Sequence, residues 1–287
     1  MKVATNNSKP SLIAVIGDVH GEIPLALHAL DQIEQQAGEP IVQVFCVGDF
    51  GLFLDPNDWA YLTGPKKYRF PENTSRIVAA WRDWRWPLAM IGGNHEPMNR
   101  LRAFDSEWFG PRFTYTDGGE LDHCVPGLRV YGLSGIYHPE SLEFPPNDYR
   151  DRHLPPRTRT WAAMVDLVGT GRISSKQLSY YKRDDIDRLK ALPPEPHLLL
   201  THDWPFPPAH LPPETDRRTE RELVDVLRPQ MHFCGHHHIP QSFSAGPSSI
   251  RALAIIRSSS TPPYQANPSW CQLLLWKDGN LSDATGQ

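Results

Sequence analysis

The chain has 287 residues, a formal net charge of −4 and an apolar fraction of 39%. This apolar content supports a buried core, and the small net charge excludes a protein that binds polyanions through its overall charge. No apolar stretch approaches the roughly 20 residues that a membrane-spanning helix needs. The amino-terminal segment has two lysines and only a short apolar run before Asp18, which is unlike a secretory signal, so we expect a cytoplasmic protein.

Short apolar runs that end in glycine-marked polar turns recur along the chain and predict buried β-strands. These predicted strands cover residues 12–16, 41–47, 88–91, 127–133, 197–200, 231–234, 250–256 and 270–276. The spacing of apolar residues predicts helices over residues 23–36, 74–84 and 219–227. Alternating strands and helices, followed by a strand-rich tail, predict the α/β class. We expect one domain over residues 1–287, built as a two-sheet β-sandwich flanked by helices.

Metal-binding residue types stand directly after five of the predicted strands. In chain order they are Asp18, His20, Asp49, Asn94, His95, His202, His236 and His238. Each alone also fits a turn, a cap or a loop, but the carboxyl ends of strands in an open α/β sheet meet at one edge, where ligands bind. Carboxylate, amide and imidazole groups without a thiolate favour a pair of first-row divalent cations (Mn, Fe, Zn, Ni or Co) over a structural zinc. Two such cations can share a bridging carboxylate and hydroxide and clamp a phosphoryl group for in-line attack.

Five strings in this order resemble the motifs of the calcineurin-like metallophosphoesterases. The strings are Gly17-Asp18-Val19-His20-Gly21, Gly48-Asp49, Gly93-Asn94-His95-Glu96, His202 and Gly235-His236-His237-His238. Together they span nearly the whole chain. The resemblance implies the four-layer αββα fold of that family and a dinuclear phosphoesterase site.

The resemblance also implies a role for each motif residue. The residues implied to hold the first cation are Asp18, His20 and His238. Those implied to hold the second are Asn94, His202 and His236, and Asp49 would bridge the two cations. His95 is not a ligand in this scheme, because it would face the scissile phosphate and either stabilise the transition state or protonate the leaving oxygen. His237 would point away from the site.

Further strings are similar to those of the RNA lariat debranching enzymes. They are Cys46-Val-Gly-Asp49-Phe50, Pro65-Lys-Lys-Tyr68-Arg69, Gly92-Gly-Asn-His-Glu96, Leu133-Ser-Gly-Ile136 and Thr201-His-Asp-Trp-Pro205. That family carries a lariat-recognition insertion between its third and fourth motifs, and here residues 149–190, within an insertion at about 140–195, occupy this place. Residues 150–190 hold ten Lys and Arg against five acidic residues, together with Trp161, Tyr180 and Tyr181. Basic and aromatic side chains together suit single-stranded RNA, although residues 176–192 also have the pattern of a plain amphipathic helix.

Asp18 departs from the debranching pattern, in which a cysteine commonly occupies this position. An aspartate restores the full ligand set of the wider family, and it favours a general phosphodiesterase, or a prokaryotic relative of the debranching enzymes, over strict lariat specificity. Gly51-Leu-Phe-Leu after the second motif is unlike the Val-Asp-Arg-Gly string of the Ser/Thr protein phosphatases, with Leu52 where they place an acidic residue.

The sequence therefore predicts a metal-dependent phosphoesterase that hydrolyses phosphodiester bonds of RNA or nucleotide substrates by attack of a metal-bridging hydroxide. One alternative is a phosphomonoesterase or a dinucleoside-polyphosphate hydrolase that uses the same cations. Another is a non-catalytic scaffold, whose signature would be degenerate ligands. All the motif positions here carry suitable side chains.

Overall fold

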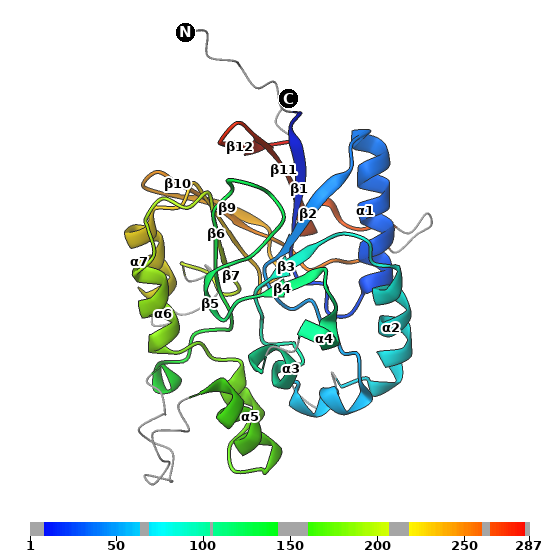
Figure 1. Ribbon diagram of the computed structural model, residues 1–287, viewed down its shortest axis with the longest axis vertical. Coiled ribbons are helices and arrows are strands. Elements are labelled where there is room, and N and C mark those ends of the chain that lie inside the picture. Colours follow the sequence, from blue (N-terminus) through cyan, green and yellow to red (C-terminus); the bar gives the residue numbers. More distant parts are fainter. Residues whose placement is uncertain are drawn as a thin grey trace.

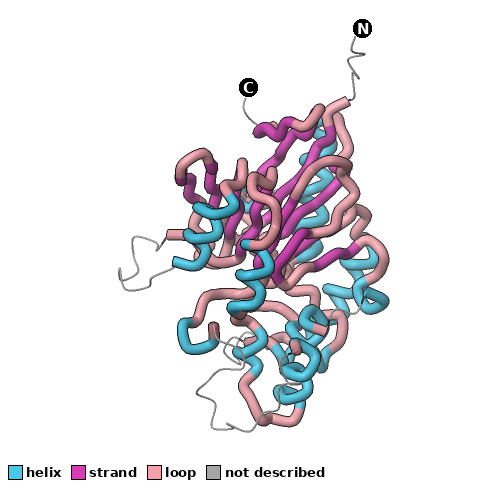
Figure 2. The backbone as a smooth tube through the Cα atoms, turned by 60° about the vertical axis from the view of Figure 1, so that its left-hand side comes forward, coloured by secondary structure: helices cyan, strands magenta, loops and turns pink. Residues whose placement is uncertain are grey.

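The computed structural model describes residues 9–63, 69–103, 106–142, 160–206, 218–259 and 265–284. Two six-stranded sheets pack face to face, and helices cover the outer face of each sheet (Figure 1). Helices α1 (Ile23–Ala37) and α2 (Thr74–Asp83) cover the first sheet, and α6 (Arg183–Lys190) and α7 (Arg218–Leu227) cover the second. Figure 2 shows the strands running between these helical layers. The predicted two-sheet sandwich with four layers is confirmed.

The first sheet has the strand order β12-β11-β1-β2-β3-β4. Its strands are β1 (Ser11–Ile16), β2 (Ile41–Cys46), β3 (Leu88–Met90), β4 (Phe113–Tyr115), β11 (Cys271–Lys277) and β12 (Asn280–Asp283). Strands β1 to β4 are parallel, whereas β11 and β12 add to the edge in antiparallel pairs. Four of these strands match predicted ones closely, while β4 and β12 are short and were not predicted.

The second sheet has the strand order β5-β6-β7-β8-β10-β9. Its strands are β5 (Gly118–Glu120), β6 (Val130–Leu133), β7 (Leu198–Thr201), β8 (Met231–Cys234), β9 (Gln241–Ala245) and β10 (Ser248–Ala252). The strand predicted over residues 250–256 is wrong beyond Ala252. Leu253 N still donates to the Cys234 carbonyl of β8 (2.8 Å), but Ala254 N donates to the Ser269 carbonyl (2.9 Å) and Ile256 N to the Asp18 carbonyl (2.9 Å), so the chain leaves the second sheet there.

The apolar runs are continuous because the central strands are covered on both faces. In β1, Leu12 and Ile16 pack with α1 and α2, whereas Ile13 and Val15 between them face the second sheet. Leu274 of β11 also lies in this layer between the sheets, together with Phe233 of β8. The alternation puts one apolar layer between the sheets and one beneath each pair of helices.

The described part of the insertion forms α5 (Trp161–Gly169), the 3-10 turn η6 (Ser175–Leu178) and α6. A single helix over residues 176–192 is wrong, because Ile136 N donates to the Ser179 carbonyl (2.9 Å) and Tyr180 pairs with Ile136. Tyr181 is buried, and its hydroxyl donates to Glu220 Oε1 (2.6 Å), so its proposed contact with RNA is also wrong. Residues 149–159 of the basic insertion, and residues 65–68 of the string that resembles the debranching enzymes, lie outside the described residues.

The remaining described helices are short. They are η1 (Pro56–Tyr61), η3 (Pro71–Asn73), α3 (Met98–Arg102), α4 (Ser106–Phe109), η4 (Pro139–Ser141) and η7 (Pro268–Trp270). Helices α3 and α5 lie beyond the carboxyl ends of β1 to β3, at the lower end of Figure 1. None of the helices in the described ranges combines the length and the apolar character needed to cross a membrane.

Replacing Leu274 tests the packing between the sheets. Leu274 is fully buried there, so Leu274→Ala should lower the free energy of unfolding by about 2–5 kcal/mol through lost burial and a cavity. Val226 on α7 is 44% exposed, and Val226→Ala should change the same quantity by no more than about 0.5 kcal/mol. Urea unfolding followed by tryptophan fluorescence measures both. Equal unfolding midpoints for the two variants would contradict this packing.

Candidate metal centre

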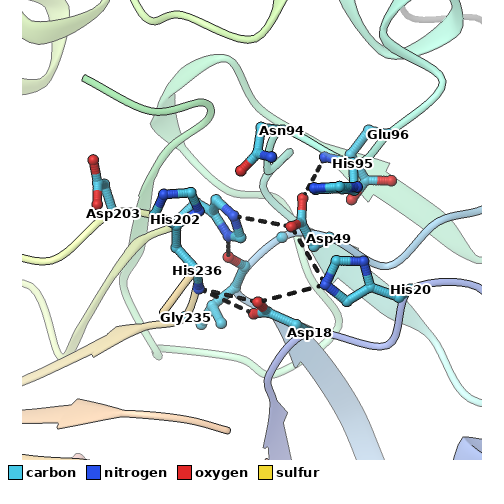
Figure 3. Close-up of polar contacts among 12 residues, drawn as sticks. Asp18, His20, Asp49, Asn94, His95, Glu96, His202, Asp203, Gly235 and His236 are labelled. Atoms are coloured by element: carbon cyan, nitrogen blue, oxygen red, sulfur yellow. Dashed lines mark hydrogen bonds and ion pairs between the residues drawn. The ribbon is translucent and has the colours of Figure 1, made fainter. Parts of the chain in front are cut away.

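The predicted ligand residues meet at one edge of the sandwich, as the strand topology requires. Asp18 follows β1, Asp49 follows β2 and Asn94 follows β3, all from the first sheet. His202 is the first residue after β7, and His236 follows β8, both from the second sheet. Figure 3 shows these side chains turned toward one another. Each sheet therefore supplies part of one constellation.

One group of candidate ligand atoms comes from Asp18, His20 and His238, and these atoms lie within 4.8 Å of one another. His238 Nε2 is 3.0 Å from Asp18 Oδ2, and His20 Nε2 is 3.9 Å from the same oxygen. The two Nε2 atoms are 3.1 Å apart. A carboxylate and two imidazoles arranged in this way can hold a divalent cation.

A second group comes from Asp49, His202 and His236 and meets the same 4.8 Å criterion. His202 Nδ1 lies 2.9 Å from the Val47 carbonyl, a contact that leaves Nε2 directed at Asp49 Oδ2, 3.3 Å away. The amide oxygen of Asn94 is buried without a hydrogen-bond partner among the described residues. A buried acceptor without a partner and an imidazole that faces a carboxylate are both consistent with coordination of a cation. Their role as ligands stays a prediction.

Asp49 connects the two groups. Its Oδ2 atom is 3.3 Å from His202 Nε2 in the second group and 3.6 Å from His20 Nε2 in the first. Its Oδ1 atom accepts a hydrogen bond from the backbone N–H of His95, at 2.6 Å. One buried carboxylate therefore faces both candidate cation positions, as a bridging ligand must.

Several candidate ligands have a backbone conformation that L-residues rarely adopt. Those with positive φ are His20 (50°), Asp49 (53°), His236 (68°) and His238 (59°). Such strain persists where surrounding contacts enforce it, and it concentrates at functional sites. Here Val19 N and His20 N both donate to the Asp49 carbonyl, at 2.9 and 2.7 Å. The loop that carries Asp18 and His20 (the first ligand loop) is thus hydrogen-bonded to the loop that carries Asp49 through the strained residues His20 and Asp49.

Two glycines permit the close approach of the ligand loops. A Cβ atom on Gly93 would lie 2.1 Å from Asp49 Oδ1, and one on Gly235 would lie 2.2 Å from Asp18 Oδ1. Any larger residue would displace these carboxylates. The backbone N–H of His236 then donates to both oxygens of Asp18, at 3.3 and 3.1 Å.

Burial and charge set the protonation of the imidazoles. Burial lowers the pKa of His20, and burial together with the nearby His202 lowers the pKa of His236 to about 3. Both rings are then neutral, which is the form that binds a metal ion. Burial alone would also lower the pKa of His202, but the Asp49 carboxylate outweighs it and raises this pKa to about 9. For Asp49, burial acts to raise the pKa, and His202 foremost holds it well below its usual range.

Sequence reasoning gave no role to two acidic residues that lie within the motif strings. Glu96 is fully buried; burial and the charge of Asp49 raise its pKa to about 8, whereas hydrogen bonds from Gly51 and Phe50 act to lower it. Asp203 directly follows His202, and its Oδ1 atom lies 3.6 Å from His237 Nε2. Their only signal in the sequence is their membership of these strings, next to His95 and His202. Ligand atoms of Asp203, His236 and His237 form a third group within 4.8 Å.

Comparisons with known proteins agree with this geometry. A family profile described as calcineurin-like phosphoesterase matches residues 11–240. The lariat debranching enzyme of Mus musculus is 26% identical over 249 residues, which are 79% of this chain and 41% of that protein. The lariat debranching enzyme of Caenorhabditis briggsae is 26% identical over 255 residues, which are 82% of this chain and 47% of that protein. The chain therefore spans less than half the length of these curated relatives.

A solved structure supports the fold alone. The crystal structure of a dimetal phosphatase from Danio rerio is similar with a TM-score of 0.53 and 13% sequence identity, over 94% of each chain. At this identity the comparison shows a shared arrangement of strands and helices. It does not extend to substrate.

Gly235→Ala tests whether the close approach at Asp18 matters for cation binding. The added Cβ should displace the Asp18 carboxylate, so most of the rise in melting temperature on adding Mn²⁺ should disappear, since only binding to the folded state stabilises it. Gly119→Ala is the matched control, because a Cβ there meets Thr116 at an ordinary 3.5 Å. A full Mn²⁺-dependent rise in the Gly235→Ala variant would show that this approach is unimportant.

The His202–Asp49 pair predicts how the stability of the metal-free protein depends on pH. The folded-state pKa of His202, about 9, lies above its ordinary value of 6.5, so the pair's contribution is fully present below pH 6.5 and is lost as the pH rises through 9. Urea unfolding with a chelator present, at pH 6 and pH 10, measures the loss. His202→Gln should remove this part of the pH dependence, and an unchanged dependence in that variant would contradict the assignment.

Proposed function

The chain belongs to the calcineurin-like phosphoesterase family, and on that premise we propose that it is a dinuclear metal-dependent phosphodiesterase acting on RNA or another nucleotide-containing diester. The observation that carries the proposal is the position of Asp49. Its carboxylate lies between His20 of one candidate ligand group and His202 of the other, at 3.6 and 3.3 Å. A carboxylate shared in this way supports two cations rather than two independent sites.

The donor set defines what could be bound and what it would do. The residues that would hold the two cations are Asp18, His20, Asp49, Asn94, His202, His236 and His238. Divalent cations bound there would supply Lewis acidity for the phosphoryl oxygens and a nucleophile from water at neutral pH. Oxygen and imidazole donors without a thiolate fit Mn, Fe, Zn, Ni or Co.

His95 is the proposed catalytic residue. Its backbone N–H is held by Asp49 Oδ1 at 2.6 Å, and its ring lies edge-on to His20 with the centroids 4.9 Å apart. Its ring is absent from the candidate ligand groups of the described residues. An imidazole fixed beside the cations can donate a proton to the leaving oxygen and stabilise charge in the transition state.

The substrate class rests on the relatives and on the insertion. The curated relatives are lariat debranching enzymes, and their similarity covers about four-fifths of this chain. In the insertion, Tyr180 is half-buried and stacks on His138, with centroids 4.5 Å apart and an interplanar angle of 29°. Stacked aromatic groups of this kind suit nucleobases. Asp18 in place of the cysteine of the debranching pattern favours a broader diester specificity.

A substrate panel with metal-reconstituted protein tests the proposed reaction. We expect faster hydrolysis of a bis-aryl phosphodiester than of the corresponding aryl monoester. Asp49→Asn should reduce the rate to that of the uncatalysed reaction, because the two ligand groups lose the carboxylate they share. Faster monoester hydrolysis would favour a phosphomonoesterase instead, and an unaffected rate in Asp49→Asn would reject the site.

RNA substrates separate the debranching activity from a general one. We expect cleavage of both a branched RNA with a 2′–5′ linkage and a linear strand of the same composition, since Asp18 favours the broader specificity. Cleavage of the branched RNA alone would make the chain a strict debranching enzyme. Cleavage of dinucleoside polyphosphates in preference to both RNAs would overturn the proposed substrate class.

A further inference from the structure

Glu96 is a fully buried carboxylate that binds backbone N–H groups on a neighbouring loop. Its Oε1 atom accepts a hydrogen bond from Phe50 N at 2.7 Å, and its Oε2 atom accepts one from Gly51 N at 3.0 Å. Both carboxylate oxygens are thus engaged by the turn that follows Asp49. None of the candidate ligand groups in the described part of the chain includes Glu96.

The turn that Glu96 holds also fixes the first ligand loop. The Asp49 carbonyl accepts hydrogen bonds from Val19 N and His20 N, and the Phe50 carbonyl accepts one from Gly21 N at 2.9 Å. The carbonyl groups of this turn therefore bind the loop of Asp18 and His20. Its N–H groups at Phe50 and Gly51 bind Glu96.

The loop that carries Asn94 and the loop that carries Asp49 donate hydrogen bonds to each other. Glu96 stands two residues after Asn94 and reaches across to the Asp49 loop, while His95 N donates back to Asp49 Oδ1 at 2.6 Å. These three bonds cross between the same two loops in opposite directions. They hold Asp49 at a φ of 53°, a conformation that an unrestrained aspartate would leave.

We propose that Glu96 is a positioning residue for both cations, because it clamps the Asp49 turn and through it the three ligand loops of the first sheet. This inference rests on the proposed metal centre but not on the identity of the substrate. Without the carboxylate, two buried N–H groups would lose their acceptor, and the Asp49 turn would relax toward an ordinary backbone conformation. The bridging oxygen would then move away from one or both ligand groups.

Glu96→Gln is the most direct test, since it preserves the shape of the side chain and replaces one acceptor oxygen with a donor. The donor would face a backbone N–H, so the clamp should fail. We expect the affinity for Mn²⁺ or Zn²⁺, measured by competition with a chromophoric chelator, to fall about 10- to 100-fold. For the hydrolysed diester, kcat should fall while KM changes by less than about twofold.

Glu220→Gln is the matched control. Glu220 is equally buried, and its Oε1 atom accepts a hydrogen bond from the Tyr181 hydroxyl at 2.6 Å, away from the ligand loops. The control should retain the wild-type metal affinity even if its melting temperature falls. Should Glu96→Gln fail to fold, Glu96→Asp keeps a carboxyl group with two acceptor oxygens but is too short to span both N–H groups, and it should weaken metal binding in the same direction.

Two results would overturn the inference. One is a metal affinity within about twofold of wild type in every folded Glu96 variant, and the other is an equal loss in Glu220→Gln, which would indicate a general effect of altering buried carboxylates. The metal titration also separates this inference from the proposed function. A wild-type protein that binds two cations but hydrolyses no ester would reject the function, and the affinity of Glu96→Gln would still decide the role of Glu96.

Discussion

The carboxylate of Asp49 is buried at the meeting point of loops from both sheets, and a buried negative charge is costly unless it is paired and hydrogen-bonded. His202 and His20 lie against one of its oxygens, and a backbone N–H donates to the other. Neighbouring features also help to accommodate this buried carboxylate. Gly93 lacks the Cβ that would collide with this carboxylate, and Asp49 adopts a positive φ of 53°. Two cations held in common would complete the compensation of its charge.

The sandwich explains how these groups come to one place. Parallel strands deliver successive loops to the same edge, so the first sheet brings the loops of Asp18, Asp49 and Asn94 together while the second brings His202 and the loop of His236. The apolar layer between the sheets sets the distance across which the two sets meet. Trp204 strengthens the second set, because its indole N–H donates to the Gly235 carbonyl at 2.6 Å and ties the two histidine loops to each other. The apolar packing between the sheets and the hydrogen bond of Trp204 therefore both help to set the positions of the ligand residues at this edge.

Sequence patterns predicted most of the central strands and the convergence of their polar ends, because continuous apolar runs and strand-end residues are local signals. Contacts between residues far apart in the sequence decide the elements that these patterns did not predict correctly. The strand predicted over residues 250–256 ends at Ala252 because the backbone beyond it bonds to the Ser269 and Asp18 carbonyls. The helix predicted over residues 176–192 breaks because Ser179 and Tyr180 pair with Ile136. Glu96 and Gly93 could not be assigned either, since a clamp or a missing Cβ has meaning only once the opposing loop is known.

The central claim is that one carboxylate joins two cation positions, and anomalous diffraction from crystals grown with Mn²⁺ tests it most directly. The account predicts two anomalous peaks per chain, with Asp49 contacting both, the first beside His20 and His238 and the second beside His202 and Asn94. A single peak, or two peaks without a shared contact to Asp49, would contradict it.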